Sequence, residues 1–155
     1  ELTVTKKERK LREDIFDLSV DAFAKQASEK EIRIENDIQP GLKFKGDVSL
    51  MQIVANNLVG NAVKYGAAGG RIVLSAQVSN GMLRVEVYND GRVIQPSEKE
   101  KLFKKFSRLT PKGERTHGTG LGLYITKEII EKHGGNIWVE PREKGNAFIF
   151  EIPQG

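Results

Sequence analysis

The chain has 155 residues, of which 38% are hydrophobic and 30% charged, a composition typical of one globular domain that excludes a disordered chain. It contains no cysteine, which excludes disulfides, thiol nucleophiles and cysteine-based metal sites. No apolar run approaches the roughly 18 residues that span a bilayer, and the charged start lacks the pattern of a signal peptide. The net charge of +4 leaves two ligand classes open, nucleic acid and a small polyanion.

Helices and strands alternate along the predicted chain. Residues 11–27 carry apolar side chains at helical spacing, and residues 48–65 do the same after Asp47, a suitable N-cap. Period-two alternation predicts strands at 32–36, 42–47, 72–78, 83–87, 136–140 and 147–153, with a hairpin at Ser79-Asn80-Gly81. Further helices are expected at 97–106 and 119–133, and Gly66 is expected to end the helix 48–65. This order predicts an α/β two-layer sandwich (α+β): a mixed sheet of about five strands covered on one face by about three helices.

The helix 48–65 carries a polar stripe beside its apolar one. Asn57, Asn61 and Lys64 recur at i, i+4 and i+7, so they share one face. A solvated surface is the usual meaning of such a stripe, but asparagine is only a middling helix former. An amide oxygen is a suitable ligand for Mg²⁺ beside phosphate oxygens, and a lysine one turn on could meet the same phosphates. The stripe therefore favours a site for a metal-bound phosphate.

Three other stretches are ambiguous when each is taken alone. VYNDGRVIQP (87–96) contains strong turn chemistry, LFKKFSRL (102–109) combines aromatic anchors with cations, and GTGLG (118–122) places glycines where a helix begins. A helix start offers unpaired N–H groups to an anion, although GTGLG matches neither the dinucleotide fingerprint nor the P-loop. A triphosphate would match the cations, and Arg108 could bind it through two hydrogen bonds.

Taken together and in this order, these stretches resemble the catalytic ATP-binding domain of bacterial sensor histidine kinases, in the GHKL group with gyrase and heat-shock chaperone ATPases. NNLVGNAVKY (56–65) resembles the N box of that family, VYNDGRVIQP its G1 box, LFKKFSRL its F box and GTGLGL its G2 box. The closing stretches ITKEIIEKHGGNIWVE and KGNAFIFEIP are similar too. The resemblance extends over nearly the whole chain from about residue 14. It implies the GHKL ATP-binding fold and a histidine kinase that uses ATP and Mg²⁺.

The resemblance implies a role for each matched residue. Asn61 would coordinate Mg²⁺, Asn57 would lie close to the phosphates in the catalytic site, and Lys64 would contact phosphate. Arg108 would reach the γ-phosphate, and Tyr65 would pack near the adenine. The other implied nucleotide contacts are Asn89, Gly91, Ile94, Gly118, Thr119, Gly120, Leu121 and Gly122, and residues 107–118 would form a lid over ATP.

The G1 box departs from the family pattern, Asp-x-Gly-x-Gly. An alignment on the glycine, isoleucine and proline of 91–96 puts Asn89 at the aspartate and Val93 at the second glycine. An asparagine oxygen can still accept a hydrogen bond from the adenine amino group, but without charge. Asp90 is one residue off and would face the opposite way on a strand. The departure puts nucleotide affinity and adenine selectivity in question, but not the fold.

The related ATPases carry a glutamate where this chain has Asn57, and an amide cannot take a proton from water at neutral pH. This difference argues for phosphoryl transfer to a protein. The family implies an acceptor histidine on a separate dimerisation domain, and we expect His117 and His133 to be surface positions instead of acceptors. We therefore expect residues 1–13 to be the linker from that domain, residues 14–155 to be the catalytic domain, and no autophosphorylation by this chain alone.

The family further implies a downstream response regulator and a cytoplasmic place of action, with membrane attachment of the parent protein left open. Two alternatives remain. A degenerate domain would serve as a nucleotide-binding or protein-interaction module with little kinase activity, as the altered G1 box suggests. A nucleic-acid binder is the weaker alternative, because most aromatic residues that could stack on bases occupy core-like positions.

Overall fold

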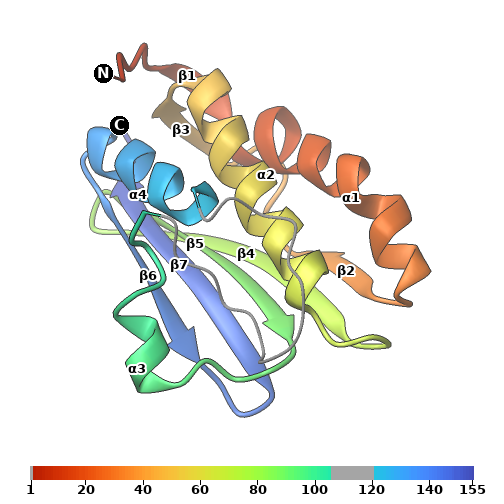
Figure 1. Ribbon diagram of the computed structural model, residues 1–155. Helices are drawn as coiled ribbons and strands as arrows, with labels where there is room; N and C mark the ends of the chain where they lie inside the picture. Colours follow the sequence, from red (N-terminus) through yellow and green to blue (C-terminus); the bar gives the residue numbers. More distant parts are fainter. Residues whose placement is uncertain (1, 106–120) are drawn as a thin grey trace.

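Five strands form one sheet in the order β2-β4-β5-β7-β6, and helices α1, α2 and α4 cover one face of it (Figure 1). The computed structural model describes residues 2–105 and 121–155. Strand β2 pairs with β4 in parallel, and the other neighbouring strands of this sheet pair antiparallel. The predicted two-layer sandwich with a mixed sheet is therefore confirmed.

The strands are β1 (Lys7–Lys10), β2 (Arg33–Asn36), β3 (Lys43–Gly46), β4 (Arg71–Ser79), β5 (Met82–Asp90), β6 (Asn136–Pro141) and β7 (Gly145–Pro153). The helices are α1 (Asp17–Glu29), α2 (Val48–Tyr65), α3 (Pro96–Lys99) and α4 (Gly122–Lys132). A π-helical turn at Leu11–Phe16 leads directly into α1, so the helix predicted for 11–27 begins with a wider turn.

Helix α2 forms as its sequence predicts. The Asp47 side chain accepts a hydrogen bond from the Leu50 N–H at 3.0 Å, which confirms the N-cap. The predicted apolar face is buried, at residues Met51, Val54, Leu58 and Ala62. Gly66 follows the last residue with a φ of −68°, so the helix ends there without the left-handed cap for which glycine is usually selected.

The hairpin between β4 and β5 turns at the predicted place. Asn80 and Gly81 have φ values of 53° and 76°, which is the left-handed backbone that a two-residue hairpin turn of this kind needs. Ser79 pairs with Met82 across the turn. The hairpin fixes the register of β5, and β5 delivers the G1-box stretch to the far end of the sheet.

The strand predicted for 42–47 forms as β3, but it lies outside the main sheet. It pairs with β1 in a separate two-stranded ribbon, with Lys7 opposite Gly46. The Leu11 N–H donates to the Leu42 carbonyl at 2.9 Å, and the Leu11 side chain is buried. Residues 7–11 are thus attached to the body of the domain by backbone pairing and by a core side chain.

Helix α3 is much shorter than the predicted helix 97–106. It ends at Lys99, and turns continue to Lys105, while residue 106 lies outside the described residues. Phe103 still anchors this segment, because its ring meets that of Phe148 edge to face with centroids 6.2 Å apart. Of the predicted helix 119–133, the described part begins at Gly122.

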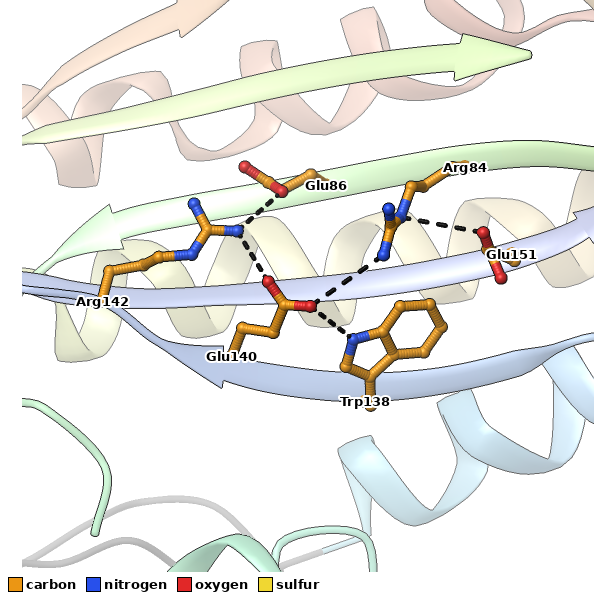
Figure 2. A network of polar contacts seen from close by, with 6 residues as sticks. All are labelled: Arg84, Glu86, Trp138, Glu140, Arg142 and Glu151. Atoms are coloured by element: carbon orange, nitrogen blue, oxygen red, sulfur yellow. Dashed lines mark hydrogen bonds and ion pairs between the residues drawn. The ribbon is translucent and has the colours of Figure 1, made fainter. Parts of the chain in front are cut away.

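The two faces of the sheet differ in chemistry. Leu83, Val85 and Val87 of β5 are buried on the helix-covered face, opposite Ile152, Phe150 and Phe148 of β7. The open face carries the polar network that Figure 2 shows. In the described ranges, no helix is long and apolar enough to cross a membrane.

The network on the open face joins three strands. Arg142 donates to Glu86 and Glu140 at 3.0 Å each. Arg84 lies between Glu140 and Glu151, at 3.9 and 3.8 Å, and its guanidinium stacks over the Trp138 ring at 5.2 Å (Figure 2). The two arginines thus offset most of the charge of the three glutamates, on the face of the sheet opposite α1, α2 and α4.

Candidate nucleotide-binding site

The predicted polar stripe runs along the side of α2 that is not buried in the core. Asn57 and Asn61 are half-buried, and Lys64 is exposed. The Lys64 Nζ lies 5.4 Å from the centroid of the neighbouring Tyr65 ring. Two amides and one ammonium group therefore follow one another along one helix face, as the spacing predicts.

Asn57 connects this stripe to the start of α4. Its Nδ2 donates to the Gly122 carbonyl at 3.0 Å and to the Thr126 Oγ1 at 3.1 Å. Thr126 is fully buried. The N-box helix and the helix that follows the G2-box glycines are thus joined by side-chain hydrogen bonds between residues 65 and 69 positions apart. Leu121 is the N-cap residue of this helix, and its carbonyl accepts from the Ile125 N–H at 2.9 Å.

The other end of the stripe meets the end of β5. Gly66 and Gly91 form an antiparallel bridge, and the Ala67 N–H donates to the Asp90 carbonyl at 2.8 Å. A Cβ on Gly91 would lie 2.8 Å from the Tyr65 carbonyl oxygen, so only glycine allows this close approach. The stretch that resembles the G1 box therefore lies directly against the last turn of α2.

Asn89 and Asp90 point to opposite faces of the sheet, as strand alternation predicts. Asn89 lies on the helix-covered face and is only 5% exposed. Asp90 accepts from the Arg71 N–H at 3.0 Å and from the Tyr88 hydroxyl at 2.7 Å on the other face. Burial and the hydrogen bond to Asp90 raise the pKa of Tyr88. Asn89, and not Asp90, is therefore the residue available to a ligand on the helix side.

Asn146 holds the loop that follows β5, and the sequence analysis did not identify it. It is buried opposite Asn89, donates to the Arg92 carbonyl at 2.8 Å and accepts from the Ile94 N–H at 2.9 Å. A polar residue among the apolar positions at the start of a strand was the available signal. Ile94 is itself buried, in a small cluster with Leu102, Val139, Phe103, Leu123 and Phe148.

A carboxylate stiffens the same loop. Glu98 forms two hydrogen bonds with the Arg92 guanidinium, at 3.0 and 2.9 Å, and accepts from the Gln95 N–H at 2.9 Å. The Arg92 contact, followed by the Gln95 N–H, lowers the pKa of Glu98. The segment after Gly91 is thus tied down by Asn146 on one side and by Glu98 on the other.

Several predicted site residues lie outside the described part of the chain: Arg108, Gly118, Thr119 and Gly120. His117 and the lid stretch 107–118 lie there as well. The described site residues are Asn57, Asn61, Lys64, Tyr65, Asn89, Gly91, Ile94, Leu121 and Gly122. The structure brings Gly122 to the middle of α2 and Gly91 to its end, whereas Ile94 is buried in the separate cluster with Leu102 and Val139.

His133 is a correction to the sequence analysis, which expected a surface position. It is 1% exposed, its Nε2 accepts from the Asp47 N–H at 3.1 Å, and its Nδ1 lies 2.9 Å from the Ile129 carbonyl oxygen. These two partners use both ring nitrogens, with the proton on Nδ1. His133 therefore joins the end of α4 to the start of α2.

The described residues offer a metal ion few ligands of their own. Within residues 2–105 and 121–155, no group of three or more His, Cys, Asp or Glu side chains could hold one. The amide oxygens of the α2 stripe fit Mg²⁺ only as a minority of its ligands, beside phosphate oxygens and water. The donor set fits a cation that arrives with a nucleotide.

Comparison with known proteins places the chain in a family. Residues 46–155 match the model of the histidine kinase-, DNA gyrase B- and HSP90-like ATPases. The chain belongs to this family, as the catalytic ATPase domain of a two-component sensor histidine kinase, and membership implies ATP binding.

The similar proteins include sensory and histidine kinases. The chain is 38% identical to the adaptive-response sensory kinase SasA of Synechococcus sp. (strain CC9902), over 80% of this chain and 33% of that protein. The catalytic domain of histidine kinase ThkA shares 35% identity, with a TM-score of 0.84 over 97% of this chain and 96% of that one. Full-length ShkA in complex with AMPPNP shares 26% identity, with a TM-score of 0.79 over 99% of this chain and 31% of that one. The chain is also 32% identical to the sensor histidine kinase WalK of Bacillus subtilis (strain 168), over 88% of this chain and 23% of that protein. It thus spans a third or less of the length of both curated relatives.

Proposed function

We propose that this domain binds Mg-ATP between α2, the start of α4 and the end of β5, and transfers the γ-phosphoryl group to a histidine of another domain. The observation that carries the proposal is the pair of contacts that α2 makes, with Gly122 through Asn57 and with Gly91 through its last turn. Three sequence stretches far apart in the chain meet along one polar helix face. The ShkA relative binds AMPPNP, which supports a nucleotide at the matching place.

Each described residue has a part in this proposal. The Asn61 amide oxygen would hold Mg²⁺, and the exposed Lys64 would reach phosphate. The Asn89 Nδ2 donates to the Asp90 carbonyl at 3.1 Å, which leaves its Oδ1 free to accept from the adenine amino group. When bound, Mg²⁺ would neutralise charge on the phosphates during transfer. Arg108, outside the described residues, would reach the γ-phosphate.

The chemistry of Asn57 favours transfer to a protein over hydrolysis. A neutral amide cannot act as a general base toward water, whereas a carboxylate at this position could. Phosphoryl transfer depends mainly on positioning and on charge stabilisation, which amides, a lysine and Mg²⁺ can supply. The buried His133 has both ring nitrogens occupied, so we propose that the acceptor histidine belongs to a separate dimerisation domain.

The proposed setting is a cytoplasmic signalling chain. ThkA was crystallised with the response regulator TrrA, which supports a response regulator as the downstream partner here. We propose that residues 1–13 connect the catalytic domain to its acceptor domain, and that β1 and Leu11 dock the end of this connection on the domain. No autophosphorylation is expected from this chain alone.

Calorimetric titration tests the proposal. The purified chain is titrated with ADP and with a non-hydrolysable ATP analogue, with and without Mg²⁺, and GTP serves as the specificity control. Asn61→Ala should weaken Mg-nucleotide binding more than roughly tenfold, because a charge-assisted contact of about 1.5–3 kcal/mol is removed. Asn56→Ala is the matched control, since Asn56 lies on the same helix but bonds Ser19 of α1. Unchanged Mg-nucleotide affinity in Asn61→Ala would exclude the metal role.

The altered G1 box favours one second candidate function. A degenerate domain would keep the fold and act as a protein-interaction module, because Asn89 and Val93 replace the usual Asp and Gly. It is expected to show no binding at millimolar nucleotide, with or without Mg²⁺. Binding that strengthens with Mg²⁺ and is absent for GTP would exclude this candidate, and phosphate transfer to an added acceptor domain would follow as the next measurement.

A further inference from the structure

The orientation of the Asn57 side chain is fixed by its partners. The Gly122 carbonyl oxygen can only accept, so the Asn57 atom 3.0 Å away must be the NH₂ nitrogen. The same nitrogen lies 3.1 Å from the Thr126 Oγ1, and a hydroxyl can accept its second hydrogen. Both NH₂ hydrogens are therefore used by α4, and the amide oxygen is the atom that Asn57 has left for other contacts.

This orientation decides what Asn57 can bind. A free NH₂ group would donate to a bare phosphate oxygen, whereas a free amide oxygen repels it. The oxygen instead attracts a cation or a water molecule that a cation holds. An Asn57 held in this way therefore favours a nucleotide that carries its metal over one that does not.

We propose that Thr126 is a positioning residue of the kinase reaction, because its buried hydroxyl keeps the Asn57 amide oxygen directed at the metal-bound phosphates. This inference rests on the proposed function. Thr126 is fully buried, so its side chain is not exposed to a bound nucleotide, and its contact with the proposed site is the hydrogen bond to Asn57. It acts through Asn57 and makes nucleotide binding depend on Mg²⁺. Without it, the Gly122 carbonyl is the one hydrogen-bond partner of the amide that remains among the described residues.

Three variants of the chain test the proposal. Thr126→Val keeps the shape and removes the hydroxyl, and Thr126→Ser keeps the hydroxyl. Ser19→Ala is the matched control, because Ser19 is also fully buried. Its Oγ donates to Asn56 at 2.7 Å, and Asn56 lies on α2, the helix that carries Asn57, on the side facing α1. Ser19→Ala thus removes a comparable hydroxyl contact of α2 away from the site.

The measurement is the ratio of nucleotide dissociation constants without and with Mg²⁺. Thr126→Val should lower this ratio roughly three- to tenfold, the value of one hydrogen bond of ordinary strength. Thr126→Ser and Ser19→Ala should keep the original ratio. A Thr126→Val ratio equal to that of the unmodified chain, or a Ser19→Ala ratio that falls equally, would overturn the inference.

A second readout does not depend on binding. The side-chain NH₂ resonances of Asn57, assigned through Asn57→Gln, should shift in Thr126→Val and stay close to their original positions in Thr126→Ser. Unshifted resonances in Thr126→Val would overturn the inference, even if this variant had lost binding. Failure of the proposed function would look different, because the unmodified chain would then bind no nucleotide while the resonances still responded to Thr126→Val.

Discussion

The two faces of the sheet are stabilised by different interactions. On the helix-covered face, strands β5 and β7 bury apolar side chains such as Val85 and Phe150 against α2 and α4. On the open face, opposite α1, α2 and α4, Arg84, Glu86 and their neighbours form a network with one another (Figure 2). Apolar burial is worth far more than exposed ion pairs. The covered face therefore provides most of the stability, and Asn89 of the proposed nucleotide site lies at one end of it.

The largest expected loss of stability comes from a substitution on the helix-covered face. Phe150→Ala should lower the free energy of unfolding by about 3–5 kcal/mol, because it leaves a cavity in a fully buried site. Urea denaturation followed by circular dichroism measures this change. Glu151→Ala, the next residue of the same strand on the open face, is the control and should cost about 1 kcal/mol or less. Similar losses in both variants would contradict the contrast between the faces.

A smaller effect is expected from the network on the open face. Arg142→Met removes the hydrogen bonds to Glu86 and Glu140 but keeps an apolar stem, so the loss should be about 1 kcal/mol or less. The loss should shrink further in 1 M salt, because surface charges are then screened. Urea denaturation at low and high salt checks both points. A salt-independent loss above about 2 kcal/mol would mean that the open face behaves like a core.

The smallest expected change in stability appears only at alkaline pH. Burial and the hydrogen bond to Asp90 raise the pKa of Tyr88 above that of the unfolded chain. Its contribution to stability is therefore complete below about pH 10 and is lost as pH rises through the folded-state pKa. Above pH 10, the melting temperature of Tyr88→Phe should fall less steeply with pH than that of the unmodified chain. Near pH 7, the two melting temperatures should change with pH in the same way. Melting temperatures across this range test the expectation, and identical alkaline slopes would contradict it.

The elements that repeat a local pattern could be predicted from the sequence. The periodicity of α2 predicted its cap at Asp47, its buried face and its polar stripe. The hairpin at Asn80 follows from local turn chemistry, which needs no knowledge of the rest of the fold. The length of α3 was overestimated, because the residues after Lys99 continue a helical pattern in the sequence, and a local pattern alone does not stabilise a short helix.

Features that depend on distant partners could not be predicted. The position of β3 beside β1 was missed because pairing between strands separated in the chain leaves no local signal. The burial of His133, its bond to Asp47 and the loop contacts of Asn146 all depend on where other elements dock. For the candidate site, the residue types and their order along the chain could be predicted from the sequence. The hydrogen bonds that orient Asn57 could be identified only in the folded structure.

The ribbon of β1 and β3 has a consequence for how this domain can be rebuilt. The Thr5 N–H donates to Asp47, and the Lys45 N–H donates to the Gln154 carbonyl, so both ends of the chain lie at one corner of the molecule (Figure 1). The Gln154 N–H also bonds the Gly81 carbonyl at that corner. The proposed nucleotide site lies toward the opposite end of β5. A short peptide could therefore close the chain into a circle, and the exposed Asn80-Gly81 turn could be cut to give new ends, far from the proposed nucleotide site.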